Sequence, residues 1–130
     1  MSENTKRFSA DKIYEFLVSA LKAAKVRDDV IKHAAEGLLS ASIRGVDSHG
    51  IRLRAHYIAA VEGGRINRNP QYKFEKTSAA TGTFDADHTF GHAAGIEAVR
   101  KAMDMAKGAG TGAVSVFNST HCGTSAFFAL

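Results

Sequence analysis

The sequence contains a single cysteine, a single proline and no tryptophan among its 130 residues. The lone cysteine, Cys122, cannot form an intrachain disulfide, so nothing in the chain points to an oxidising compartment. No apolar run approaches the length of a membrane-spanning helix, and the first ten residues lack the apolar stretch of a secretory signal. By elimination, we expect a cytoplasmic protein with no membrane association.

Positive charge is in slight excess, with 17 Lys and Arg against 13 Asp and Glu and a formal net charge of +4. The basic residues are scattered, with no run of five or more and few aromatic residues between them, so a nucleic-acid partner is not indicated. A mild positive bias also suits small anionic substrates and phosphate-bearing cofactors. Hydrophobic residues make up 45%, which is enough for a packed core and too many for a disordered chain.

The first part of the chain predicts an αα-hairpin. Ser9 has the chemistry of a helix N-cap, and the apolar residues behind it recur with helical spacing. A second helix is expected to begin near Asp28 or Asp29, where a carboxylate can cap free backbone amides and meet the positive end of the helix dipole. A short polar link joins the two helices.

A third helix is expected from about Ile51 to Glu62. The pair Gly63-Gly64 ends it, because glycine adopts the left-handed conformation that follows many helices. The loop that follows contains the only proline, Pro70. We place a lobe boundary there, so that residues 1–70 form a helical amino-terminal lobe.

After residue 70 the spacing of the apolar residues changes to that of strands. Residues 72–75, 81–85 and 113–117 are predicted strands, and residues 91 to about 108 are a predicted helix. Another helix is expected from residue 126, with Phe127, Phe128 and Leu130 lacking a partner. We therefore predict an α+β fold in which residues 71–130 begin an α/β lobe that has too few strands to cover its helix and is incomplete.

Residues 44–54 bring a hydroxyl, an imidazole and several guanidinium groups into one turn at a helix start. Such a turn can present His49 to a ligand, while Ser48 can orient the imidazole or pass a proton, and a nearby arginine can pair with a carboxylate. Reduction of a 2-oxo acid needs such an anchor and an acid that protonates the oxygen as hydride arrives. The same residues also fit a capping turn in which His49 is structural.

A second polar cluster, Asn-Ser-Thr-His-Cys-Gly-Thr-Ser at residues 118–125, lies between a predicted strand and a predicted helix. Glycine and small hydroxyl residues at a helix start leave backbone amides free to bind phosphate. The run is neither GxGxxG nor a Walker loop. It fits an ordinary polar strand-to-helix turn equally well.

Three other chemistries receive little support. His88 and His92 are four residues apart, but Gly91 between them argues against a single helix, and no zinc signature surrounds them, so no metal is expected. A thiol nucleophile at Cys122 would depend on its sequence neighbour, and neighbours seldom reach the needed geometry. A serine hydrolase would need a G-x-S-x-G elbow, which is missing.

Residues 44–52, 57–70, 85–87, 91–95 and 112–124 together resemble the malate/L-lactate dehydrogenase family, which includes ureidoglycolate, sulfolactate and diketogulonate oxidoreductases. The motifs agree in order and spacing, and the resemblance covers about residues 10–130. It implies a homodimeric oxidoreductase that transfers a hydride between NAD or NADP and a small 2-oxo or 2-hydroxy acid such as malate or lactate. It also implies a cofactor lobe that is not a Rossmann fold, in keeping with the missing GxGxxG.

The resemblance also implies roles for individual residues. His49 would be the proton donor or acceptor, with Ser48 beside it in a relay, and His121 would lie at the active site. The cofactor site would be lined by His121, Gly123, Thr124 and Ser125.

The chain departs from the family pattern in two respects. Many members carry a substrate-binding arginine five positions after the motif serine, where this chain has Leu53 between Arg52 and Arg54. We favour Arg52 for the substrate carboxylate, because some relatives carry theirs there. Relatives are also more than twice as long, so we expect the 130-residue chain to be inactive alone. The alternative hypothesis is a non-catalytic remnant that binds a partner through uncovered apolar surface.

Overall fold

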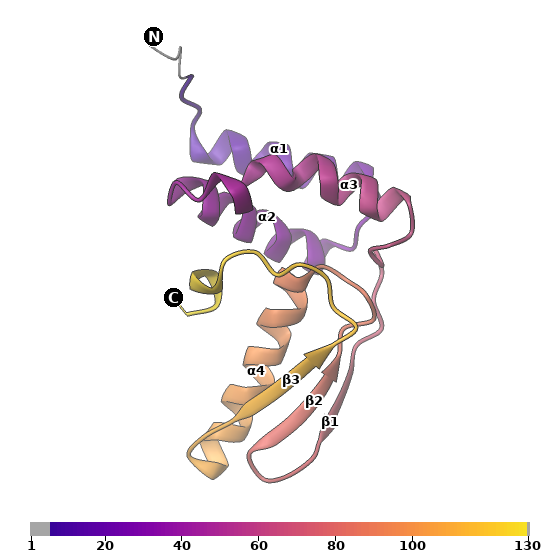
Figure 1. Ribbon diagram of the computed structural model, residues 1–130, viewed down its shortest axis with the longest axis vertical. Helices are drawn as coiled ribbons and strands as arrows, with labels where there is room; N and C mark the ends of the chain where they lie inside the picture. Colours follow the sequence, from indigo (N-terminus) through magenta and orange to yellow (C-terminus); the bar gives the residue numbers. More distant parts are fainter. Residues whose placement is uncertain (1–5, 130) are drawn as a thin grey trace.

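The computed structural model describes residues 6–129, which form helices in one layer and a small sheet with its own helix in another (Figure 1). The helical layer contains α1 (Ala10–Ala23), α2 (Asp28–Ile43) and α3 (Arg54–Glu62). The second layer contains α4 (Gly91–Ala109) packed on β1 (Lys73–Lys76), β2 (Thr81–Asp85) and β3 (Ala113–Phe117). The fold is α+β, as the sequence predicts.

The predicted hairpin of α1 and α2 is present. Ser9 is the N-cap of α1, and its hydroxyl accepts a hydrogen bond from the amide of Lys12 at 3.2 Å. Helix α2 begins at Asp28, but its N-cap residue is Arg27, which makes no side-chain cap. Asp28 and Asp29 lie in the first turn instead, where their charge meets the helix dipole.

The third helix begins later than expected, at Arg54 rather than Ile51. Two 3-10 helices, η1 (Asp47–His49) and η2 (Ile51–Leu53), precede it. Gly50 separates them in an extended conformation, and a Cβ at this position would collide with the hydroxyl of Ser42. That hydroxyl accepts a hydrogen bond from the amide of Ile51 at 2.9 Å. The absence of a side chain at residue 50 therefore lets this turn lie directly on α2.

The sheet combines both strand directions. β1 pairs antiparallel with β2, and β2 pairs parallel with β3 after the chain crosses through α4. Phe84 of β2, which is 2% exposed, leads a core cluster with Ala86 and with Ala94 and Ala98 of α4. The predicted strands are thus correct in number and within one residue in position for the part of the chain that the structure describes.

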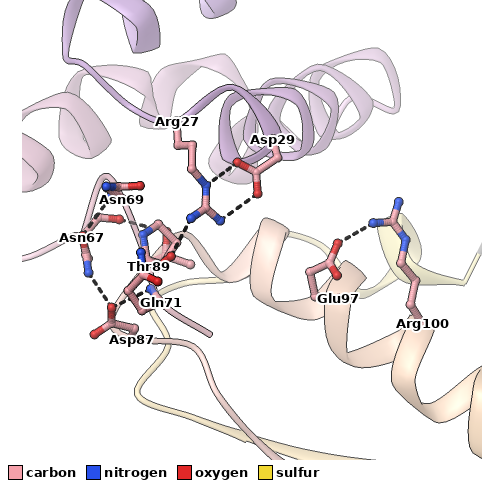
Figure 2. A network of polar contacts seen from close by, with 10 residues as sticks. Arg27, Asp29, Asn67, Asn69, Gln71, Asp87, Thr89, Glu97 and Arg100 are labelled. Carbon is pink, nitrogen blue, oxygen red and sulfur yellow. Dashed lines mark hydrogen bonds and ion pairs between the residues drawn. The ribbon is translucent and has the colours of Figure 1, made fainter. Parts of the chain in front are cut away.

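Polar contacts join the helical layer to the loops that flank β1 and β2 (Figure 2). The guanidinium of Arg27 donates to the carbonyl of Pro70 at 2.6 Å and to both carboxylate oxygens of Asp29 at 2.6 and 2.8 Å. Asn67 donates to Asp87 at 2.8 Å. Phe90, at the start of α4, belongs to the core of the helical layer. Helix α4 therefore contacts the helical layer as well as the strands. The lobe boundary at residue 70 stays a prediction.

The last described segment differs from expectation. Instead of an α-helix from residue 126, the chain forms a 3-10 helix, η3 (Ser125–Phe128). Phe127 and Phe128 do have partners: Phe128 covers Gly95 of α4, where a Cβ would occupy the same space, and Phe127 lies edge-on to His92 with ring centroids 6.0 Å apart. Leu130, expected to be unpartnered with them, lies outside the described residues. Within residues 6–129, no helix has the length and apolar character needed to cross a membrane.

Candidate active site

Two polar segments that are far apart in the sequence meet between the layers. The imidazole rings of His49, in η1, and His121, in the turn after β3, lie with their centroids 5.1 Å apart. A cavity of about 370 Å³ is lined by Ser48, His49, Leu53, His56, Tyr57 and His121. The structure thus brings together the three residues predicted to be catalytic, Ser48, His49 and His121.

The cavity wall contributed by residues 48–57 is built from three successive helical segments. Ser48 and His49 lie in η1, Leu53 ends η2, and His56 and Tyr57 lie in α3. Leu53 and Tyr57 are four residues apart, a spacing that places two side chains on one face of a helix. His49 lies beyond the break at Gly50, so its separation from Leu53 in the sequence carries no such signal.

His49 is oriented by its neighbour. The hydroxyl of Ser48 lies 2.9 Å from Nδ1 of His49. Ser48 is exposed and His49 is half-buried. With Nδ1 engaged by the serine, Nε2 is the nitrogen left for a ligand, and the hydroxyl can relay a proton to or from the ring.

His121 is held by Tyr57, a residue that the sequence interpretation did not select. The phenol oxygen lies 2.6 Å from Nδ1 of the imidazole. Burial, with a smaller contribution from Cys122, raises the pKa of Tyr57 to about 12. Burial, followed by the nearby His49 and His56, lowers the pKa of His121. Near neutral pH the phenol of Tyr57 therefore keeps its proton, and its O–H can donate a hydrogen bond to Nδ1 of His121. In a neutral His121 the ring proton then lies on Nε2.

The turn that carries His121 rests on the first residue of α4. A Cβ on Gly91 would meet the carbonyl oxygen of His121 at 2.7 Å and collide with that of Thr120. The hydroxyl of Thr120 donates to the carbonyl of Thr89 at 2.9 Å, and Asn118 adopts a left-handed φ of 48° at the start of the turn. The glycine thus permits the close approach that positions the imidazole.

The arginines are distributed differently from expectation. Arg52 is exposed and does not line the His49–His121 cavity, whereas Leu53 does. The guanidinium of Arg54 stacks over the ring of Phe16 at 4.8 Å from its centroid. Arg65, which the sequence interpretation passed over, lines an adjoining cavity together with His121.

The residues predicted to line a cofactor site follow His121 but lie outside its cavity. Gly123 has a φ of +75° and packs against the ring of the buried His92. The hydroxyl of Thr124 is buried and has no hydrogen-bond partner among the described residues, and Ser125 is exposed at the start of η3. Across residues 6–129, no three histidine, cysteine or acidic side chains are grouped so that they could hold a metal ion.

The sequence of this chain is similar to that of known proteins. The sequence matches the malate/L-lactate dehydrogenase family over residues 8–130. The chain belongs to that family. It is 31% identical over 130 residues to malate dehydrogenase of Pyrococcus abyssi, covering 100% of this chain and 36% of that protein. It is 32% identical over 114 residues to L-sulfolactate dehydrogenase of Methanocaldococcus jannaschii, covering 88% of this chain and 33% of that one.

A solved structure shares both the sequence pattern and the fold. The crystal structure of malate dehydrogenase from Entamoeba histolytica superposes with a TM-score of 0.92 at 31% identity, over 98% of this chain and 36% of the other. The chain therefore spans about a third of the length of the relatives that it matches, and these relatives are hydroxy-acid dehydrogenases.

Proposed function

We propose that this chain carries the proton-handling part of an NAD(P)-dependent 2-hydroxy-acid dehydrogenase, which interconverts small 2-oxo and 2-hydroxy acids such as malate or lactate. The observation that carries the proposal is the meeting of the Ser48–His49 pair with the Tyr57–His121 pair at one cavity. Each imidazole is oriented through Nδ1, so each offers Nε2 to a ligand.

The nicotinamide cofactor supplies the hydride when it is bound. The protein must then provide a proton for the substrate oxygen during reduction and remove it during oxidation. His49 is our candidate for that proton, with Ser48 as its relay. Neutral His121 donates a hydrogen bond from Nε2 to the same oxygen, because Tyr57 occupies Nδ1.

Arg52 remains the proposed partner of the substrate carboxylate. Its exposed position next to the cavity-lining Leu53 leaves the side chain free to turn. A guanidinium can bind a carboxylate through two parallel hydrogen bonds, which would fix the substrate beside His49.

Gly123, Thr124 and Ser125 would hold part of the cofactor, in a lobe that is not a Rossmann fold. The unpartnered buried hydroxyl of Thr124 supports this assignment, because buried polar groups are normally hydrogen-bonded and a ribose or phosphate oxygen could supply the missing partner. The remaining contacts would come from segments that the relatives have beyond the matched third. We further propose a cytoplasmic homodimer, and we expect the 130-residue chain alone to lack turnover.

Cofactor binding can be measured directly, because the chain has no tryptophan and the fluorescence of bound NADH is free of overlap from indole. NADH and NADPH would be titrated into the wild-type chain, a Thr124→Val variant and, as a matched control, a Thr77→Val variant on the β1–β2 turn. We expect saturable binding of one cofactor that Thr124→Val weakens and Thr77→Val leaves unchanged. No binding by a folded, monodisperse chain would contradict a cofactor site at these residues.

The proton role needs a complete enzyme. In a chimera, residues 1–130 would replace the matching segment of a malate dehydrogenase relative. We expect His49→Ala to lower turnover by roughly 10²–10⁴-fold, the usual effect of removing a general acid–base group. His33→Gln, on α2, is the control. A folded chimera whose turnover is unaffected by His49→Ala would overturn the assignment.

A further inference from the structure

A second cavity, of about 340 Å³, adjoins the candidate active site. The two cavities share His56, Tyr57 and His121 as lining residues. The second is bounded in addition by Arg65, which precedes β1, by His88, which follows β2, and by Ser119 and Thr120, which follow β3. A ligand held at His49 and His121 could therefore extend past Tyr57 into this second space.

The lining of the second cavity contains no carboxylate. Its polar groups are a guanidinium, three imidazoles, a phenol and two hydroxyls, all of which can donate hydrogen bonds. Asp87 lines a separate cavity that also touches Arg65 and His88, and its Oδ2 already accepts from the side chain of Asn67 at 2.8 Å and the amide of Gln71 at 2.9 Å. A space that holds a guanidinium, several groups able to donate hydrogen bonds and no carboxylate favours an anion.

The guanidinium of Arg65 is positioned by a neutral partner. One of its terminal nitrogens lies 2.8 Å from Nε2 of His56 on α3. Because a guanidinium can only donate, the imidazole nitrogen accepts here and contributes no negative charge. No ion pair involves Arg65 among the residues that the structure describes. Its orientation is thus restricted while its charge remains available.

We propose that Arg65, oriented by His56, is a specificity-determining residue that binds a second carboxylate of the substrate. The chain would then favour dicarboxylic 2-hydroxy acids over their monocarboxylic counterparts. This inference rests on the proposed function, because it assumes that the hydroxyl-bearing carbon lies at His49 and His121. Malate and lactate form a matched pair of probes, since malate is lactate with a carboxylate on the methyl carbon.

Binding of the two acids can be compared on the 130-residue chain by titrating L-malate and L-lactate while following the histidine ring signals by NMR. We expect tighter binding of malate than of lactate. Arg65→Gln should weaken malate binding about tenfold or more, the usual effect of losing a charge-assisted hydrogen bond, and leave lactate binding within about twofold. Arg65→Lys keeps the positive charge but loses the planar pair of N–H donors of the guanidinium, so it should retain part of the preference for malate over lactate.

Arg68→Gln is the matched control, because Arg68 lies three residues away, donates to the carbonyl of Val61 and does not line the second cavity. The inference is overturned if the wild-type chain does not bind malate more tightly than lactate, or if Arg65→Gln weakens the binding of both acids equally. It is also overturned if Arg68→Gln weakens malate binding as much as Arg65→Gln does.

A His49→Ala variant separates this inference from the proposed function. If His49→Ala leaves turnover of the chimera unchanged while Arg65→Gln abolishes the preference of the 130-residue chain for malate, the Arg65 site stands and the catalytic proposal fails. If His49→Ala lowers turnover of the chimera and Arg65→Gln changes the binding of neither acid, the catalytic proposal stands and the Arg65 site fails.

Discussion

The phenol oxygen of Tyr57 and Nδ1 of His121 are 2.6 Å apart, although 64 positions separate the two residues in the chain. Tyr57 belongs to α3 in the helical layer, whereas His121 follows β3 in the second layer. This contact therefore ties together the two halves of the candidate active site and sets which nitrogen of His121 faces the cavity.

Tyr57→Phe should remove that hydrogen bond while keeping the buried ring. We expect a loss of about 1 kcal/mol in the free energy of unfolding, the typical net value of a hydrogen bond. The ring of His121 should also lose its preference for the Nε2-protonated form. Urea unfolding and the ¹⁵N chemical shifts of the imidazole measure the two effects.

Tyr14→Phe is the control, because Tyr14 lies on α1 and packs against the helical core. It should change neither quantity appreciably. A Tyr57→Phe variant in which the tautomer of His121 is unchanged would show that the phenol does not orient the ring.

Gly91→Ala should displace the turn that carries His121. The added methyl group would lie against the backbone of residues 120–122, which cannot yield as a flexible side chain can. We expect a destabilisation of about 1–3 kcal/mol, as for other overpacked sites, and loss of the His121–Tyr57 contact. Thermal unfolding and the NMR signal of His121 provide the measurements.

Gly108→Ala tests the same substitution on the same helix with nothing within 4 Å of the new Cβ. Alanine favours a helix by about 0.5–1 kcal/mol over glycine, so this variant should be more stable than the wild type. Equal destabilisation by both substitutions would rule out the backbone contact as the cause.

His92 should make the fold sensitive to mild acid. Its ring is fully buried, neither ring nitrogen has a hydrogen-bond partner among the described residues, and burial, with a smaller effect of His121, lowers its pKa from 6.5 to about 4. Above pH 6.5 the ring is neutral in both the folded and unfolded states. As the pH falls from 6.5 towards 4, the unfolded chain takes up a proton that the folded chain excludes, so stability decreases by about 3 kcal/mol in total.

His92→Phe should flatten this part of the curve of unfolding free energy against pH. The slope between pH 4 and 6.5 is the readout, since the larger ring also alters stability at every pH. The same substitution at the exposed His88 should leave the slope as it is in the wild type. A wild-type slope that persists in His92→Phe would assign the acid sensitivity to other groups.

Arg27→Gln should weaken the junction between the layers. The guanidinium binds the carbonyl of Pro70 and the carboxylate of Asp29, and this pairing lowers the pKa of Asp29. We expect a loss of about 1–3 kcal/mol in urea unfolding at neutral pH, because hydrogen bonds to charged groups are stronger than neutral ones. Arg100→Gln, which removes an exposed pair with Glu97 one turn away on α4, should cost no more than about 0.5 kcal/mol. Similar losses in both variants would contradict a special role for Arg27.

Local patterns in the sequence predicted local structure well. The N-cap at Ser9 is confirmed, and Gly64 adopts the predicted left-handed conformation with a φ of +74°. Periodicity located α1 to α4 and β1 to β3 because each signal lies within a few residues, whereas the α-helix expected from residue 126 is a 3-10 helix. The start of α3 was predicted three residues too early, because the break at Gly50 depends on its contact with Ser42 of α2.

The candidate site was predicted only in part. The motifs at residues 44–54 and 118–125 drew attention to His49 and His121, and the structure brings the two rings together. Tyr57 and Arg65 were missed, because their importance depends on partners that become neighbours only when the chain folds. The exposure of Arg52 and the position of Leu53 depend on the two 3-10 turns, in which each residue turns further about the axis than in an α-helix.

The parallel pairing of β2 with β3 has a kinetic consequence. Thr81 pairs with Ala113 across the whole of α4, so this ladder cannot form until a long segment has closed into a loop, whereas α1 and α2 need only local contacts. His121 lies beyond that ladder, and its bond to Tyr57 spans twice the distance along the chain. The candidate active site around Tyr57 and His121 should therefore assemble late during folding. It should also be the first region to exchange its amide protons when the native protein opens locally.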